Sequence, residues 1–223
     1  MSVTPSVVVF DVNETMSDMS PMAARFIDVG APASMAQLWF ASVLRDGFAL
    51  SVTGSARSFV EIGEETLRVL LPPAQPNRPV DDAVAHIVAG FAELMVHPDI
   101  APGVHRLHED GLRLVTLSNG ARDVAEKLVA DADIADCFEH LLSVEDVGVW
   151  KPDRRAYEHA ATTCDVPLEE MLLVAVHPWD LDGAAKAGMQ TAWLNRSEAH
   201  YPAVFTPPTH TIGSLEELPE LLG

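Results

Sequence analysis

Four polar residues that could do chemistry follow separate apolar stretches of the sequence. Asp11 ends the run at residues 6–10, and Ser118, Lys151 and Asp180 stand at or shortly after later runs. Each has an ordinary explanation when taken alone, because serine and aspartate often cap helices and lysine is mostly exposed. The carboxyl ends of parallel strands, however, lie at one edge of a sheet, where ligands bind. The joint occurrence of all four residues therefore predicts that they converge at such an edge.

Alternating strand and helix patterns predict the elements that would carry these residues. Short apolar runs indicate strands at 6–10, 112–117, 141–144, 171–176, 190–194 and 209–212. Helical patterns cover 121–131, 153–164, 182–188 and 214–222. Strands that alternate with helices require crossover connections, so the fold class is α/β with a parallel sheet flanked by helices.

The region from about residue 16 to residue 97 breaks this alternation. It shows helical periodicity at 33–50, 55–71 and 82–94, and a proline-rich stretch at 71–77 separates two of these helices. We expect a helical domain inserted after the first strand. The predicted domains are an α/β core of residues 1–15 and 98–223 and a helical cap of residues 16–97.

Composition limits the partners of the chain. The 223 residues include 48% apolar residues and carry a net charge of −19. That field repels nucleic acids and anionic membranes, and an acidic substrate would need local positive groups to offset it. The sequence lacks a span of membrane length and a signal-peptide pattern, so a cytoplasmic protein is expected. Cys137 and Cys164 are too few for a disulfide framework and lack metal-ligand spacing.

Together these residues resemble the four motifs of the haloacid dehalogenase superfamily. The motifs are Asp11 with Thr15, Ser118-Asn119-Gly120, Lys151-Pro152 and Asp180. Residues 147–158, which include Tyr157, and Trp179-Asp180 followed by Gly183-Ala184 resemble the type II 2-haloacid dehalogenases more closely. The resemblance covers essentially the whole chain and implies a Rossmann-like parallel sheet flanked by helices, with an inserted helical cap.

The resemblance also implies catalytic roles. Asp11 would attack the carbon that bears the halide and form an aspartyl ester, which water then hydrolyses. Lys151 would keep Asp11 ionised and supply positive charge for an acidic substrate. Asp180 would orient or deprotonate the water, with Tyr157 beside it.

Further residues are implied to bind the substrate. Thr15 and Ser118 would aim the nucleophile or hold the substrate carboxylate. Asn119 would donate to the departing halide, and Trp179 would line the same site.

Magnesium-dependent phosphatases of the superfamily are the main competing class. They place an acidic residue two positions after the nucleophile, where this chain has Asn13, and a metal-binding carboxylate where it has Val176. Asp182 could in principle substitute, but it is expected on the helix that follows. A departing halide needs no proton, so a dehalogenase can dispense with the acidic residue at position 13. Because the metal-binding carboxylate is also missing, we expect neither a metal nor another cofactor.

Three departures from the type II pattern affect substrate recognition. Phe40 stands where those enzymes carry a halide-binding arginine, and Arg45, five residues later, is either a substitute or a surface residue. Asn13 replaces an aromatic residue. Ala175 and His177 replace a serine and an asparagine. His177 has two open interpretations, a structural residue or a catalytic one that activates water or replaces part of the halide cradle.

Three hypotheses follow for function. The first is metal-independent hydrolytic dehalogenation of short 2-haloalkanoic acids, fluoroacetate included, with inversion at the carbon. The second is opening of a small-ring acid of the azetidine-2-carboxylate type through the same ester. The third is a non-catalytic binding protein, which the retained lysine and carboxylates disfavour because buried charges cost stability. The expected partners are a small carboxylate substrate and, by resemblance, a second copy of the chain bound through the cap.

Overall fold

The computed structural model describes residues 4–223 and divides the chain into two compact units. The α/β unit comprises the chain up to Ser17 together with Met95–Gly223, and the helical unit comprises Asp18–Leu94. Within residues 4–223, no helix combines the length and apolar content needed to cross a membrane.

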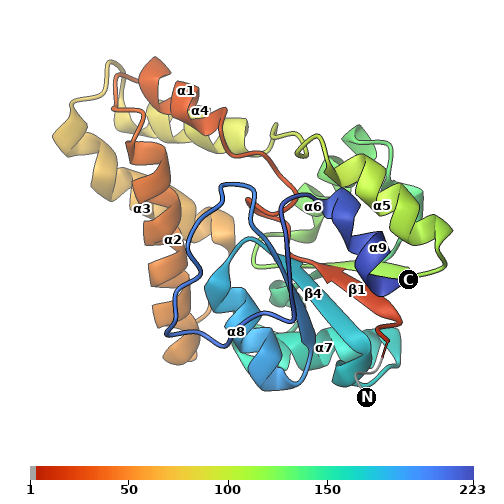
Figure 1. The fold of residues 1–223 in the computed structure, drawn as a ribbon. Helices are drawn as coiled ribbons and strands as arrows, with labels where there is room; N and C mark the ends of the chain where they lie inside the picture. The colour runs from red at the N-terminus through yellow and green to blue at the C-terminus, as the bar shows by residue number, and fades with distance from the viewer. Residues whose placement is uncertain (1–3) are drawn as a thin grey trace. The chain divides into compact units, whose positions relative to one another are not determined.

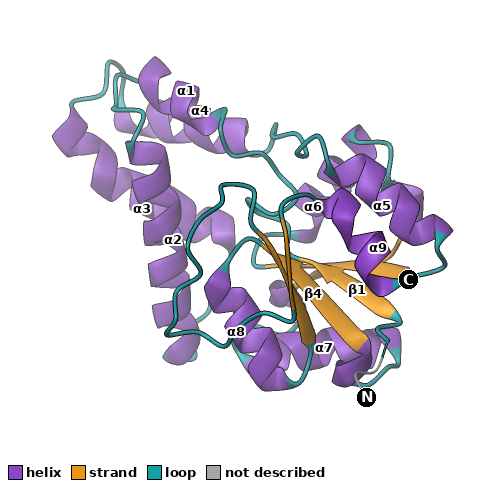
Figure 2. Cartoon of the chain, viewed as in Figure 1, coloured by secondary structure: helices purple, strands orange, loops and turns teal. Residues whose placement is uncertain are grey.

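A parallel six-stranded sheet forms the centre of the α/β unit (Figure 2). Its strands lie in the order β3-β2-β1-β4-β5-β6. Their bounds are β1 Val7–Phe10, β2 Arg113–Ser118, β3 Phe138–Ser143, β4 Met171–Ala175, β5 Gln190–Leu194 and β6 His210–Ile212. All residues of β1 and β4 are buried, as expected for central strands covered on both faces. The sheet confirms the predicted fold class.

The strand register brings the ends of the central strands to one level. Phe10 pairs with Thr116 of β2 and with Val174 of β4. Asp11, the next residue of the chain, therefore lies beside the carboxyl ends of both neighbouring strands. This is the edge at which open α/β sheets bind ligands.

Five α-helices accompany the sheet in the α/β unit (Figure 1). They are α5 Ile100–Glu109, α6 Arg122–Asp131, α7 Arg154–Cys164, α8 Pro178–Ala187 and α9 Leu218–Leu222. Helix α5 was not predicted, because Pro102 and Gly103 interrupt its pattern. Gly103 packs against Leu215, and a β-carbon there would lie 2.6 Å from the leucine Cγ.

Among the element boundaries that differ from the prediction, two concern the sheet edge and the site. Strand β3 begins at Phe138 rather than 141, because it lies at the sheet edge and includes the polar residues Glu139 and His140. Helix α8 begins at Pro178 rather than 182, since proline at the first helical position is preorganised for a helix. The second difference places Asp180 in the first turn of α8.

Four helices form the helical unit: α1 Met22–Asp28, α2 Met35–Val52, α3 Phe59–Ala74 and α4 Val80–Phe91. Helix α1 was not predicted, and α3 continues through Pro72 and Pro73, which were expected to lie outside it. Trp39 lies at the centre of this unit, with its ring 5.8 Å from that of Phe91 and its indole N–H donating to the Gly63 carbonyl at 3.0 Å.

Candidate active site

The loop after β1 holds the carboxylate of Asp11 in a fixed direction. Thr15 donates its hydroxyl hydrogen to Oδ2 of Asp11 at 2.5 Å, and the backbone N–H of Val176 donates to the Thr15 hydroxyl oxygen at 3.1 Å. Thr15 is fully buried and Asp11 is 4% exposed. Thr15 therefore links the candidate nucleophile to the end of β4.

Lys151 brings together two carboxylates from distant parts of the chain. Its ammonium nitrogen lies 2.8 Å from Oδ1 of Asp11 and 2.7 Å from Oδ2 of Asp180. The side chains of Lys151 and Asp180 are both 0% exposed. Buried charges are tolerated only when they are paired and hydrogen-bonded, so each of these three groups requires the others.

The loop after β2 positions Lys151 through its backbone. The amide oxygen of Asn119 accepts from the Lys151 N–H at 2.9 Å, and the Asn119 amide nitrogen donates to the Lys151 carbonyl at 3.4 Å. Ser118 accepts from the N–H of Gly120 at 2.9 Å and so shapes the turn. The expected contact of Asn119 with halide and of Ser118 with substrate remain predictions.

Tyr157 fixes the second carboxylate. Its hydroxyl donates to Oδ1 of Asp180 at 2.6 Å and also lies 3.0 Å from the Asp180 carbonyl oxygen. Gly183 makes room for this contact, because a β-carbon there would lie 2.6 Å from the tyrosine oxygen and 2.5 Å from Pro152. The glycine of the last motif is thus explained by packing against Tyr157.

Burial and pairing act differently on the two carboxylates. Burial opposes ionisation of Asp11, but the charges of Lys151 and His177 and the hydrogen bonds from Lys151 and Thr15 lower its pKa below the ordinary value. Burial, together with the nearby Asp11 charge, raises the pKa of Asp180. Asp11 is therefore suited to remain an ionised nucleophile, whereas Asp180 is suited to accept a proton.

The pKa values of the two donors are raised. Burial disfavours the charged form of Lys151, but Asp11 and Asp180 outweigh it and raise the lysine pKa. Burial and the Asp180 charge raise the pKa of Tyr157 well above its ordinary value. Lysine thus retains its charge and tyrosine retains its proton.

His177 lies beside the nucleophile on the side opposite Lys151. Its Nε2 is 3.1 Å from the Asn13 carbonyl oxygen and 3.6 Å from Oδ2 of Asp11. The ring of Trp179 stacks on the imidazole, with ring centroids 5.2 Å apart and an interplanar angle of 19°. The backbone carbonyl of Asn13 therefore contributes to the site, and the expected substrate contact of its side chain remains a prediction.

Glu14 is a site residue that was not assigned a role from the sequence. Its Oε2 lies 3.7 Å from Nε2 of His177, and its φ of 62° is a left-handed conformation that usually favours glycine. Burial and the Asp11 charge raise the pKa of Glu14, partly offset by His177. The sequence signal that could have identified Glu14 is its position as an acidic residue in the loop that carries the nucleophile.

Phe40 and Arg45 lie in the helical unit. Phe40 is buried in α2, where its ring is 6.0 Å from that of Phe59. The Arg45 side chain is 69% exposed and pairs with neighbouring Asp46 at 2.7 Å. Their expected contact with substrate remains a prediction.

The residues around Asp11 do not fit the magnesium site of the phosphatases. Val176 offers no side-chain oxygen, and Mg²⁺ requires oxygen ligands in near-octahedral arrangement. Nε2 of His177 instead lies between the Asp11 carboxylate and the Asn13 carbonyl, both oxygens that such an ion would need. Among residues 4–223, no three histidine, cysteine or acidic side chains are arranged to hold a metal ion.

Comparison with known proteins shows what the whole chain is similar to. The family model for haloacid dehalogenase-like hydrolases matches residues 5–188. The (S)-2-haloacid dehalogenase H-109 of Pseudomonas putida is 30% identical over 218 residues, which is 96% of each chain. The crystal structure of an L-2-haloacid dehalogenase has a TM-score of 0.92 and 27% identity, covering 99% of each chain. A dehalogenase structure with an intermediate complex has a TM-score of 0.91 and 26% identity, covering 98% of this chain and 97% of the other.

Because Lys151 pairs with two buried carboxylates, we predict that its replacement lowers stability in a pH-dependent way. Lys151→Met should lower the free energy of unfolding near pH 7 by about 3–5 kcal/mol, because two buried carboxylates lose their cation. Without Lys151 the folded pair holds a proton more tightly than the unfolded chain, so the loss should grow as pH rises and shrink toward about pH 5.

Urea denaturation at both pH values measures this effect, with exposed Lys127→Met as the matched control. An equal loss at the two pH values would contradict the carboxylate-pair explanation.

Proposed function

The chain belongs to the haloacid dehalogenase-like hydrolase family, and we propose that it hydrolyses short 2-haloalkanoic acids to 2-hydroxy acids. The observation that carries this proposal is the buried Asp11–Lys151–Asp180 arrangement. It supplies an ionised carboxylate, a fixed positive charge and a carboxylate of raised pKa at one edge of the sheet.

In the proposed first step, an oxygen of Asp11 attacks carbon 2 of the substrate in line with the carbon–halogen bond. The carbon–oxygen bond forms as halide leaves with the bonding electron pair, so this step needs no proton. Attack from the side opposite the halogen inverts the carbon. Thr15 and Lys151 aim the attacking carboxylate through their hydrogen bonds.

In the proposed second step, water attacks Cγ of Asp11 and the ester is hydrolysed. Asp180 accepts a proton from the water, and Tyr157 holds Asp180 in place. Lys151 stabilises the negative charge that develops on the Asp11 oxygen next to it. The configuration at carbon 2 is unchanged, because only the bond to Cγ breaks.

The charge of the substrate fits the local field at the site. A chain of net charge −19 repels an acidic substrate, and Lys151 supplies positive charge at the nucleophile. We propose that the helical unit acts as a cap that excludes water, with Phe40 and Arg45 as candidate substrate contacts. Small polar donors suit fluoride, so fluoroacetate is included among the proposed substrates.

Opening of a small-ring acid such as azetidine-2-carboxylate is the second candidate. The observation that favours it is the imidazole of His177, 3.6 Å from Oδ2 of Asp11. A departing ring nitrogen needs a proton, whereas a departing halide does not.

Halide release is the direct test of the proposed function. The purified protein should release halide from chloroacetate, fluoroacetate or one enantiomer of 2-chloropropionate in the presence of EDTA. Asp11→Asn should reduce the rate by at least about 10³-fold, because the amide is a poor nucleophile.

Ion chromatography and chiral analysis of the 2-hydroxy acid measure the rate and the configuration. Retention of configuration, or equal rates in Asp11→Asn, would rule out the proposed mechanism. Ring opening of azetidine-2-carboxylate without halide release would favour the second candidate.

A homodimer through the helical unit is also proposed. A groove of about 870 Å³ lies along α2 and α3, and Leu38 and Val69 at its margin are 52% and 72% exposed. Exposed apolar groups of this kind mark candidate interfaces.

Sedimentation velocity should give twice the chain mass for the wild-type protein and the single-chain mass for Val69→Glu, because a buried unpaired charge opposes association. Val204→Glu, at an exposed valine of the α/β unit, is the control. A monomeric wild-type protein would contradict the dimer.

A further inference from the structure

The geometry points to a second proton-transfer group at the nucleophile: His177 donates its Nε2 proton to the product oxygen during ester hydrolysis, and Glu14 positions the imidazole for this transfer. This inference rests on the proposed function and deepens it, because it assigns different tasks to the two oxygens of Asp11.

The first observation is the oxygen environment of His177 Nε2. The Asn13 carbonyl oxygen lies at 3.1 Å, Oδ2 of Asp11 at 3.6 Å and Oε2 of Glu14 at 3.7 Å. These are three acceptors, and two belong to carboxylates. Because acceptor oxygens surround Nε2, this is the ring nitrogen suited to carry and donate a proton. The stacked indole of Trp179 fixes the plane of the ring.

The second observation is that the two oxygens of Asp11 have different partners. Oδ1 contacts the ammonium group of Lys151, which is fully buried and paired with two carboxylates. A lysine so stabilised as a cation is a poor proton donor, so Oδ1 is suited to carry negative charge. Oδ2 faces Thr15 and His177. We therefore assign the attack on carbon 2 to Oδ2.

The third observation is that the backbone of Glu14 is held in position. Its N–H donates to the Ser17 hydroxyl at 3.3 Å, and its carbonyl oxygen lies 3.2 Å from Nε2 of His97. The loop thus keeps a non-glycine residue in a left-handed conformation. An outlier of this kind is common at functional sites and here directs a carboxylate toward His177.

The hydrolysis balances with these groups. Water adds to Cγ and gives one proton to Asp180, while negative charge develops on Oδ1. The Cγ–Oδ2 bond then breaks, and Oδ2 leaves with its electron pair as part of the product. It takes the Nε2 proton of His177 and becomes the hydroxyl of the 2-hydroxy acid. The new Asp11 carboxylic acid returns its proton to His177, and Asp180 releases the other proton to solvent.

Several charged groups lie around His177. Asp11 and Glu14 face Nε2 directly, and the Lys151–Asp180 pair lies on the far side of Asp11. His97 contacts the backbone of Glu14. Removal of the Glu14 carboxylate should slow ester hydrolysis, because the imidazole loses one of the groups that position it beside Asp11.

The test separates ester formation from ester hydrolysis, with chloroacetate as substrate. Single-turnover chloride release measures formation. Intact-protein mass spectrometry after acid quench measures the carboxymethyl ester on Asp11. His177→Asn should release about one chloride per chain at close to the wild-type rate, accumulate the ester, and turn over about 100-fold more slowly or worse.

Two variants of Glu14 separate its charge from its shape. Glu14→Gln and Glu14→Gly should both slow ester hydrolysis about fivefold. Glu14→Gly should also unfold at the same or a higher temperature than wild type, because glycine suits a φ of 62°. A slower rate without lost stability distinguishes positioning of His177 from support of the fold.

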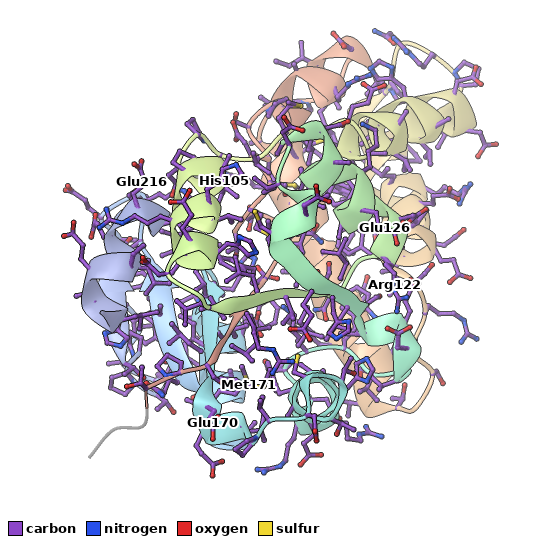
Figure 3. The ribbon with its side chains drawn as sticks, turned by 90° about the vertical axis from the view of Figure 1, so that its right-hand side faces the viewer. His105, Arg122, Glu126, Glu170, Met171 and Glu216 are labelled. Atoms are coloured by element: carbon purple, nitrogen blue, oxygen red, sulfur yellow. The ribbon has the colours of Figure 1, made fainter. Side chains whose placement is uncertain are left out.

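Matched controls lie on two helices of the α/β unit (Figure 3). His105→Asn on α5 and Glu126→Gln on α6 should leave both steps unchanged. If His177→Asn does not fold, His177→Gln replaces it.

The outcomes separate the two proposals. If the His177 variant releases chloride and turns over at the wild-type rates, this inference is overturned and the proposed function stands. The same holds if both Glu14 variants hydrolyse the ester at the wild-type rate. The inference is also overturned if the His177 variant loses chloride release and turnover to the same extent and accumulates no ester. Absence of halide release by the wild-type protein from chloroacetate, fluoroacetate and both enantiomers of 2-chloropropionate overturns both.

Discussion

The ammonium group of Lys151, buried between Asp11 and Asp180, is the interaction on which the rest of the site depends. Its three members come from the end of β1, the loop after β3 and the first turn of α8. None of these charges is stable in the interior without the others, so the sheet must bring all three segments together before the charges are satisfied. Asn119 and Tyr157 then fix the lysine backbone and the second carboxylate. Such an arrangement is retained for chemistry, since an apolar core would be as stable or more so.

The convergence of Asp11, Lys151 and Asp180 could be predicted because parallel strands place their carboxyl ends at one edge, whatever the details of packing. The parallel sheet followed from apolar runs of strand length alternating with helical patterns. Helices α1 and α5 were missed, since short helices that contain proline or glycine have weak periodicity. The partners of Asn119 and Glu14 could not be predicted, because they depend on side-chain directions that tertiary packing decides.

The two carboxylate oxygens of Asp11 have different hydrogen-bonding partners. A fully buried lysine contacts one oxygen of Asp11, and a threonine and a histidine face the other. The surrounding chain is strongly acidic, so this local balance must come from few groups placed accurately. Burial makes each of them more effective than it would be in water, because the local dielectric constant is low.

The left-handed backbone at Glu14 bears on how such a site can change during evolution. Glutamate and glycine codons differ by a single nucleotide, and the loop already has the conformation that glycine prefers. One point mutation can therefore add or remove a carboxylate beside the reacting group while the fold pays little penalty in either direction. The rate of ester hydrolysis within a lineage could change through this position without loss of the fold.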